Sequence, residues 1–200
     1  MSTRRGDRLA NVAGAVLTGG ASTRMGIDKA RLPVDGVACA TRVASRLDAL
    51  CTEVVLVGGD PPADAPGRRV PDLPGPGCAL RGVLGALEAC TAERVLVLAT
   101  DLPFVTADLL LALVAWPEAD VVVPRDAGGI HPLCAIYRRE VVAPVARRHL
   151  SEDRLALRAT LDAVVTRHFG GDELAAVDPD GRALTNLNTP EDLAAVSARG

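Results

Sequence analysis

One stretch near the start of the chain gathers the residues best suited to bind an anion. A short apolar run, Ala15–Leu17, is followed at once by Gly19 and Gly20. Glycine permits positive φ and close approach, so paired glycines after a strand expose backbone N–H groups that can wrap a phosphate. Arg24 and Lys29 add a planar guanidinium fork and a mobile ammonium to the same stretch. The spacing therefore predicts a phosphate-binding loop.

Two common phosphate-binding motifs do not fit this loop. A Walker A motif requires Lys directly after its last Gly, whereas two residues separate Gly26 from Lys29. A dinucleotide fingerprint requires G-x-G-x-x-G, which the adjacent Gly19 and Gly20 interrupt. The loop is therefore expected to belong to another class of phosphate-binding protein.

The composition sets Lys29 apart from the other basic residues. The chain has 22 Lys and Arg residues together, and Lys29 is the one lysine among them. A slim ammonium can reach between phosphate oxygens where the larger guanidinium does not fit. We therefore expect Lys29 to contact phosphate.

Asp101 is a second candidate for chemistry. The apolar run Arg94–Ala99 predicts a buried strand, and Asp101 follows it after one residue. In open α/β sheets, ligands bind beyond the carboxyl ends of the strands, so Asp101 is expected in the same crevice as the glycine loop. Asp101 could instead cap the next helix, but Thr106 is a better N-cap for a helix over 107–115.

Hydrophobic periodicity predicts the elements that position these residues. Apolar spacing of three and four over 38–50 predicts a helix, and the apolar run 53–57 predicts a second strand. Strand, helix and strand in this order form a βαβ unit with parallel strands and a right-handed crossover. We expect further helices over 80–91, 107–115, 138–149 and 154–161, and strands over 120–124, 130–137 and 163–169. The short turn at Gly128-Gly129 predicts an antiparallel strand in an otherwise parallel sheet.

The composition favours a folded globular protein and argues against several kinds of partner. The 200 residues suit one domain, and 48% hydrophobic residues supply a full core. The net charge is −3 and no basic stripe with interleaved aromatic residues occurs, which argues against a nucleic-acid partner. No run reaches transmembrane length, and five cysteines without a C-x-x-C pair are typical of reduced thiols. We therefore expect a cytoplasmic protein without a membrane contact.

The residues around the glycine loop form a longer pattern that resembles a known family. The run from Leu17 to Leu32 reads L-x-G-G-x-S-x-R-M-G-x-D-K-A-x-L without a gap. A D-L-P-F string begins at Asp101, and N-L-N-T-P-E-D-L begins at Asn186. These three motifs, in this order, resemble the MobA family of molybdenum cofactor guanylyltransferases. The resemblance covers residues 14–193.

The resemblance implies a fold and a reaction. The implied fold is α/β, a three-layer Rossmann-like nucleotidyltransferase fold with a mostly parallel sheet and one antiparallel strand. One MobA-like NTP transferase domain would fill residues 1–200, with a ragged N-terminus over 1–11. The implied reaction transfers GMP from GTP to the phosphate of molybdopterin and releases pyrophosphate. GTP and molybdopterin would be the small-molecule partners, with transient contact to molybdoenzyme-maturation proteins.

The resemblance also implies which residues form the site. The implied GTP-binding residues are Leu17, Thr18, Gly19, Gly20, Ser22, Arg24, Lys29, Gly58, Asp72 and Asp101. Among these, Lys29, Arg24 and Asp101 are the implied catalytic residues, and Asp101 is the implied ligand of Mg²⁺. The implied residues on the pterin side are Asn186, Asn188 and His131.

Structural roles stay open for the residues on the pterin side. In an extended segment, alternation places Asn186 and Asn188 on one face and Leu187 on the other, in the core. The two asparagines could also brace the turn into the last helix through local backbone bonds. His131 could equally be a structural or surface histidine.

Two alternatives to GTP transfer stay open. A sister nucleotidyltransferase using CTP, ATP or a sugar phosphate would have the same backbone and would differ in its contacts to the base. One segment expected to contact the base follows the second strand and begins Gly58-Gly59, where the family often has Asn. The L-x-G-G form of the first motif favours GTP. A non-catalytic nucleotide-binding module is the other alternative, and the intact Lys29, Asp72 and Asp101 argue against it. The loop after Asp72 is one residue longer than the family's P-G-x-G-P-L-A-G and lacks its second Pro, so its contacts cannot be carried over.

Overall fold

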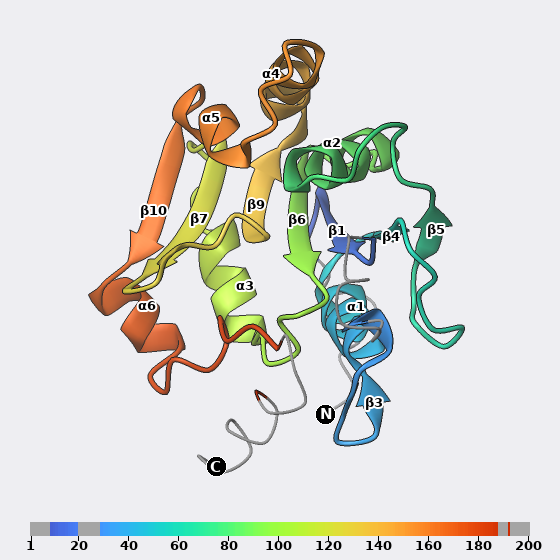
Figure 1. Ribbon diagram of the computed structural model, residues 1–200. Coiled ribbons are helices and arrows are strands. Elements are labelled where there is room, and N and C mark those ends of the chain that lie inside the picture. The colour runs from blue at the N-terminus through green and yellow to red at the C-terminus, as the bar shows by residue number, and fades with distance from the viewer. Residues whose placement is uncertain (1–8, 20–28, 188–191, 193–200) are drawn as a thin grey trace.

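The computed structural model describes residues 9–19, 29–187 and 192 of the chain. Its centre is an eight-stranded sheet in the order β10-β7-β9-β6-β1-β4-β5, with β8 paired to β7 (Figure 1). A small hairpin, β2 (Pro33–Val34) and β3 (Val37–Ala38), stands apart from this sheet. The strands of the main sheet are β1 (Val12–Leu17), β4 (Val54–Val57), β5 (Arg68–Val70), β6 (Arg94–Ala99), β7 (Val121–Asp126), β8 (Gly129–Ile130), β9 (Cys134–Arg138) and β10 (Thr166–Gly170).

Strand β1 lies at the centre of the parallel part of the sheet. It pairs in parallel with β4, where Ala15 faces Val55, and with β6, where Ala15 faces Val97. All six residues of β1 are buried, which is the pattern of a parallel strand covered on both faces. The carboxyl ends of β1, β4 and β6 therefore lie side by side at one edge.

Helices cover both faces of the sheet and form the outer layers (Figure 1). Alternation along β1 divides the core, because Val12 and Val16 belong to one apolar cluster and Ala13, Ala15 and Leu17 to the other. The first cluster is covered by α1 (Cys39–Leu50), α3 (Ala107–Val114) and α6 (Asp172–Val177), and the second by α2 (Ala79–Ala89), α4 (Arg139–Ser151) and α5 (Leu157–Asp162). The predicted three-layer α/β fold with a mostly parallel sheet is confirmed.

The predicted strand over 130–137 is wrong in its extent. The structure divides it into β8, which pairs antiparallel with β7, and β9, which runs antiparallel between β6 and β7. Pro132 lies at the break and has no N–H to donate to a ladder, which explains why pairing stops there. The predicted antiparallel strand is therefore β9, and the two-residue β8 is a second one.

The short elements β5 and α6 were not predicted. β5 has three residues in a stretch rich in Pro and Gly, and it forms by pairing with β4 at the sheet edge, where Val57 faces Val70. α6 has six residues and follows Gly171, whose φ is +57°. β5 depends on its pairing with β4, and α6 is too short to show a periodic pattern, so local sequence reasoning did not reveal them.

The predicted helices agree with the observed ones within a few residues. Thr106 caps α3 as expected, since its Oγ1 accepts a hydrogen bond from the backbone N–H of Leu109 at 3.2 Å. The longest described helix, α4, has 13 residues. In the part of the chain that the structure describes, no helix is long and apolar enough to cross a membrane.

Candidate functional site

A cavity of about 690 Å³ opens at the carboxyl ends of β1, β4 and β6; we call it the strand-end cavity. This is the edge at which ligands bind in open α/β sheets. Its lining includes many of the residues singled out from the sequence, namely Leu17, Thr18, Gly19, Lys29, Asp72 and Asp101. Four other predicted site residues, Gly20, Ser22, Arg24 and Asn188, lie outside the described residues.

The Asp72 carboxylate lies against the loops that follow β1 and β4. A Cβ atom on Gly19 would lie 2.6 Å from Oδ2 of Asp72, and one on Gly58 would lie 2.2 Å from the same oxygen. Gly58 also has φ of +71°, which disfavours any other residue. The two glycines therefore leave the room that lets a carboxylate from the loop after β5 enter the strand-end cavity.

Thr18 ties the ends of β1 and β4 together. Its hydroxyl is buried and lies 3.1 Å from the carbonyl oxygen of Val57 and 2.6 Å from that of Gly58. A hydroxyl has one proton to donate, so these carbonyls share it. The side chain of Thr18 therefore sets the spacing between the two loops.

Asp101 and Lys29 are two oppositely charged residues that line the strand-end cavity. Asp101 is half-buried just beyond β6, and Lys29 begins the short 3₁₀ helix η2 (Lys29–Arg31). Burial raises the pKa of the Asp101 carboxyl, and the nearby Lys29 ammonium partly opposes this rise. The ionised form of a buried carboxylate is stabilised when a second cation binds beside it. The site is therefore suited to an anionic ligand accompanied by a metal ion.

The C-terminal segment is fastened to the Asp101 loop. The backbone N–H of Leu187 donates to the carbonyl oxygen of Asp101 at 2.8 Å. The Leu187 side chain is buried with Val34 and Cys39, whereas Asn186 is exposed. The predicted alternation between Asn186 and Leu187 is therefore observed, and Asn186 lies next to the residue that contacts the Asp101 loop.

We expect Leu187→Ala to lower the free energy of unfolding by about 2–5 kcal/mol, because it opens a cavity beneath the Asp101 loop. Denaturant unfolding measures this loss. Asn186→Ala is the matched control and should change the free energy of unfolding by less than about 0.5 kcal/mol, since its side chain is exposed. Equal losses for the two variants would contradict the alternation.

His131 does not line the strand-end cavity. Its Nε2 lies 2.9 Å from Oδ2 of Asp126, at the turn between β7 and β8. The other carboxylate oxygen of Asp126 accepts from the backbone N–H groups of Gly128 and Gly129. In the structure the His131 side chain thus lies against the carboxylate of its own hairpin.

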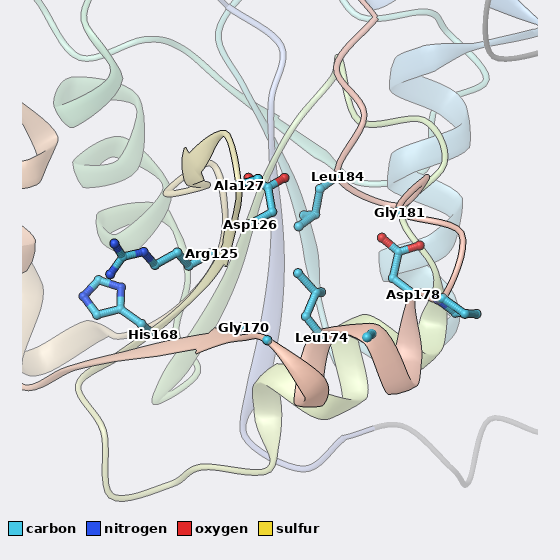
Figure 2. A pocket seen from close by; sticks show the side chains of 12 residues that line it. Arg125, Asp126, Ala127, His168, Gly170, Leu174, Asp178, Gly181 and Leu184 are labelled. Atoms are coloured by element: carbon cyan, nitrogen blue, oxygen red, sulfur yellow. The ribbon is translucent and has the colours of Figure 1, made fainter.

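A second hollow of about 570 Å³, which we call the β10 cavity, lies beyond the ends of β7 and β10 (Figure 2). Arg125 and His168 lie at one end and Asp178 at the other, with Leu174 and Leu184 between them (Figure 2). Sequence reasoning did not reveal this cavity because α6, which forms one wall, was not predicted.

Arg81 is a residue of the strand-end cavity that sequence reasoning did not assign. It lies in the first turn of α2 and lines the cavity together with Leu73, Gly75 and Cys78. The sequence offered only a weak signal for Arg81. It is a single basic residue after the loop 71–77, and the family pattern did not predict the contacts of that loop.

Comparison with known proteins agrees with this geometry. The family model for the MobA-like NTP transferase domain matches residues 14–168. The chain is 37% identical over 197 residues to a probable molybdenum cofactor guanylyltransferase of Chloroflexus aggregans, covering 94% of each chain. It is 32% identical over 188 residues to the molybdenum cofactor guanylyltransferase of Desulfosudis oleivorans, covering 91% of this chain and 92% of that one.

Solved structures share the fold at lower identity. Molybdopterin-guanine dinucleotide biosynthesis protein A of Archaeoglobus fulgidus superposes with a TM-score of 0.78 at 21% identity, over 94% of this chain and all of that one. The 2-C-methyl-D-erythritol 4-phosphate cytidylyltransferase of Thermus thermophilus superposes with a TM-score of 0.70 at 16% identity, over 94% of this chain and 98% of that one. The same backbone therefore occurs in proteins named for different substrates.

Proposed function

The chain belongs to the MobA-like NTP transferase family, and we propose that it transfers GMP from GTP to the phosphate of molybdopterin with release of pyrophosphate. This proposal rests on one observation: a single cavity at the ends of parallel strands is lined by Gly19, Lys29, Asp72 and Asp101. Relatives named molybdenum cofactor guanylyltransferase support the choice of nucleotide and acceptor. We take residues 1–200 as one domain of this type.

The proposed reaction brings two anions together, so the site must hold them in line and neutralise their charge. Gly19 and Gly20 would donate backbone N–H groups to the triphosphate, and Lys29 and Arg24 would contact its oxygens. Positioning and fixed charges lower the barrier without a covalent enzyme intermediate. Ser22, Leu17 and Gly58 complete the proposed nucleotide-binding set.

A divalent metal ion fits the strand-end cavity, and we propose that it is Mg²⁺. Mg²⁺ commonly takes one or two carboxylates together with substrate phosphates and water. Two carboxylates line the cavity, those of Asp101 and Asp72, and burial raises the pKa of Asp101. Among the residues that the structure describes, no cluster of three or more metal-ligating side chains occurs. Asp101 would hold the ion, which when bound neutralises charge on the phosphate oxygens.

The acceptor is proposed to bind along the C-terminal segment. Asn186 is exposed beside the Leu187–Asp101 contact, and its amide can donate and accept hydrogen bonds to a pterin edge. Leu184 of the same segment lines the β10 cavity, so an acceptor on this segment would extend from Asp101 toward that cavity. Asn188 is proposed to act with Asn186, and a contact of His131 with the acceptor stays a prediction.

We expect GTP to stabilise the protein more than CTP or ATP does. At a hundred times Kd, a ligand adds about 2.7 kcal/mol to the free energy of unfolding. For a chain of this size, that corresponds to a rise in Tm of about 5–10 °C. Melting curves with each nucleoside triphosphate and Mg²⁺ measure the preference. A larger rise in Tm with CTP than with GTP would assign the chain to the cytidylyltransferase type. Binding of GTP without release of pyrophosphate in the presence of molybdopterin would indicate a non-catalytic module.

The compartment and the protein partners are also proposals. All five cysteines are free thiols, and four of them are buried, which suits a reducing compartment such as the cytoplasm. Transient contact with molybdoenzyme-maturation proteins stays a prediction.

A further inference from the structure

One wall of the strand-end cavity is formed by the loop between β5 and α2, residues 71–77, which we call the proline loop. Leu73, Gly75 and Gly77 of this loop line the cavity. Three of its seven residues are prolines, which have no backbone N–H to donate. Outside the helices and strands, no backbone–backbone hydrogen bond between described residues involves residues 71–77. Among the described residues, the hydrogen bonds to the backbone of this loop therefore come from a side chain.

Arg81 supplies that side chain. Its Nε donates to the carbonyl oxygen of Pro76 at 3.0 Å, and its Nη1 donates to the carbonyl oxygen of Pro74. The guanidinium packs against Gly75, where a Cβ atom would lie 2.8 Å from Cζ of Arg81 and where φ is +118°. The planar fork of Arg can hold two carbonyls at once, whereas the single ammonium of Lys cannot reproduce this geometry. Arg81 and Gly75 together form a clasp on the loop.

We propose that Arg81 is a positioning residue for nucleotide binding, because its clasp holds the proline loop in the shape that walls the strand-end cavity. This inference rests on the proposed function, in which that cavity binds GTP. A loop that is ordered before binding spares the ligand the entropic cost of ordering it. The clasp occurs where the chain departs from the family pattern by one extra residue and a missing Pro. The prolines restrict φ within the loop, and the hydrogen bonds from Arg81 hold the loop against α2.

Cys78 offers a reporter of the loop that does not depend on catalysis. It directly follows the proline loop, lines the strand-end cavity and is half-buried, whereas the other four cysteines are buried. Burial raises the pKa of Cys39 to about 11 and the pKa of Cys90 and Cys134 to about 12, so these thiols form little thiolate at neutral pH. A thiol reagent should therefore label Cys78 first in the folded protein.

The experiment compares Arg81→Ala and Arg81→Lys with wild type and with Arg147→Ala. Arg147 is the matched control because it also contacts α2, through Glu88, but lies on the exposed surface. Losing two hydrogen bonds is expected to raise the Cys78 labelling rate of ligand-free Arg81→Ala about 10-fold, and the KM for GTP by a similar factor. The kcat should stay within about twofold, since only binding is weakened. Arg81→Lys should fall between wild type and Arg81→Ala, and the control should match wild type.

Gly75→Ala breaks the clasp from the loop side and leaves Arg81 in place. It should reproduce the effects of Arg81→Ala, and combining the two should add little, because both remove the same contact. The proposal would be overturned if Arg81→Ala showed the same Cys78 labelling rate and the same KM as wild type. It would also be overturned if Arg81→Ala lowered kcat and left KM unchanged, because Arg81 would then contact the transition state directly. If wild-type protein neither binds nor turns over GTP, the proposed function fails, while labelling of the ligand-free variants still decides whether the clasp exists.

Discussion

Asp101→Asn is expected to lower turnover by about 100- to 1,000-fold while the ligand-free protein melts at or slightly above the wild-type temperature. Asn keeps the size of the side chain and one oxygen, but it removes the negative charge that would hold a divalent cation. Steady-state pyrophosphate release with saturating GTP, Mg²⁺ and molybdopterin measures the loss. Asp108→Asn is the matched control, since Asp108 is an exposed carboxylate in the first turn of α3 and should leave turnover unchanged.

The expected stability of Asp101→Asn follows from the direction of the pKa shift. Burial raises the pKa of Asp101 in the folded protein above its unfolded value of about 3.9. A raised pKa means that the folded state binds the proton more tightly, so this contribution to stability is full below the unfolded pKa and is lost as pH rises through the folded pKa. At neutral pH the ionised carboxylate therefore destabilises the ligand-free protein, and Asn removes that cost. The advantage of the variant should shrink as the pH falls through the folded-state pKa, because the wild-type carboxyl then binds a proton and is uncharged like Asn.

A structural role for Asp101 predicts the opposite pair of results. If Asp101 mainly capped the following helix, Asp101→Asn would lower the melting temperature of the ligand-free protein and leave turnover nearly intact. The structure already assigns the cap of α3 to Thr106. Melting curves and turnover measured on one preparation thus separate the two roles.

The central elements of the fold could be predicted because their signals are local. The strand predicted over Arg94–Ala99 is β6, since a continuous apolar run between polar neighbours marks a buried parallel strand. The three-residue β5 and the break at Pro132 could not be predicted with the same rules. Each depends on which strand lies alongside, and that information is not contained in a short window.

The candidate site divides in the same way. Gly19, Lys29 and Asp101 could be placed at one sheet edge, because each directly follows or lies near the end of a strand expected to be parallel. Asp72 is assigned to the site by the family resemblance alone, since the position of its carboxylate depends on space left by glycines in two other loops. The bond from Leu187 to the Asp101 carbonyl joins segments 86 residues apart, and no local pattern encodes it. Sequence motifs thus supply the chemistry, and long-range packing supplies its geometry.

Lys29→Arg is expected to keep the fold and to lower kcat/KM for GTP by about 100-fold, which corresponds to about 2.7 kcal/mol of transition-state stabilisation. Lys29 lines the strand-end cavity at the start of η2, and its charge already acts on Asp101. Arg supplies the same charge, so the electrostatic effect on Asp101 remains while the shape of the cation changes. A guanidinium is broader than an ammonium and needs a different set of oxygens around it.

Two further variants decide whether shape or charge matters at position 29. Lys29→Met removes the charge, so it should lose at least as much turnover as Lys29→Arg and should raise the pKa of Asp101 further, because the opposing cation is gone. Arg31→Lys, in the same short helix, keeps the charge of a side chain that pairs with Asp60 at the surface, and it should stay within about twofold of wild type, because surface ion pairs contribute little. Near-normal turnover in Lys29→Arg combined with a large loss in Lys29→Met would show that charge alone is required. In that case the single lysine of an arginine-rich chain would need an explanation other than its fit between phosphate oxygens.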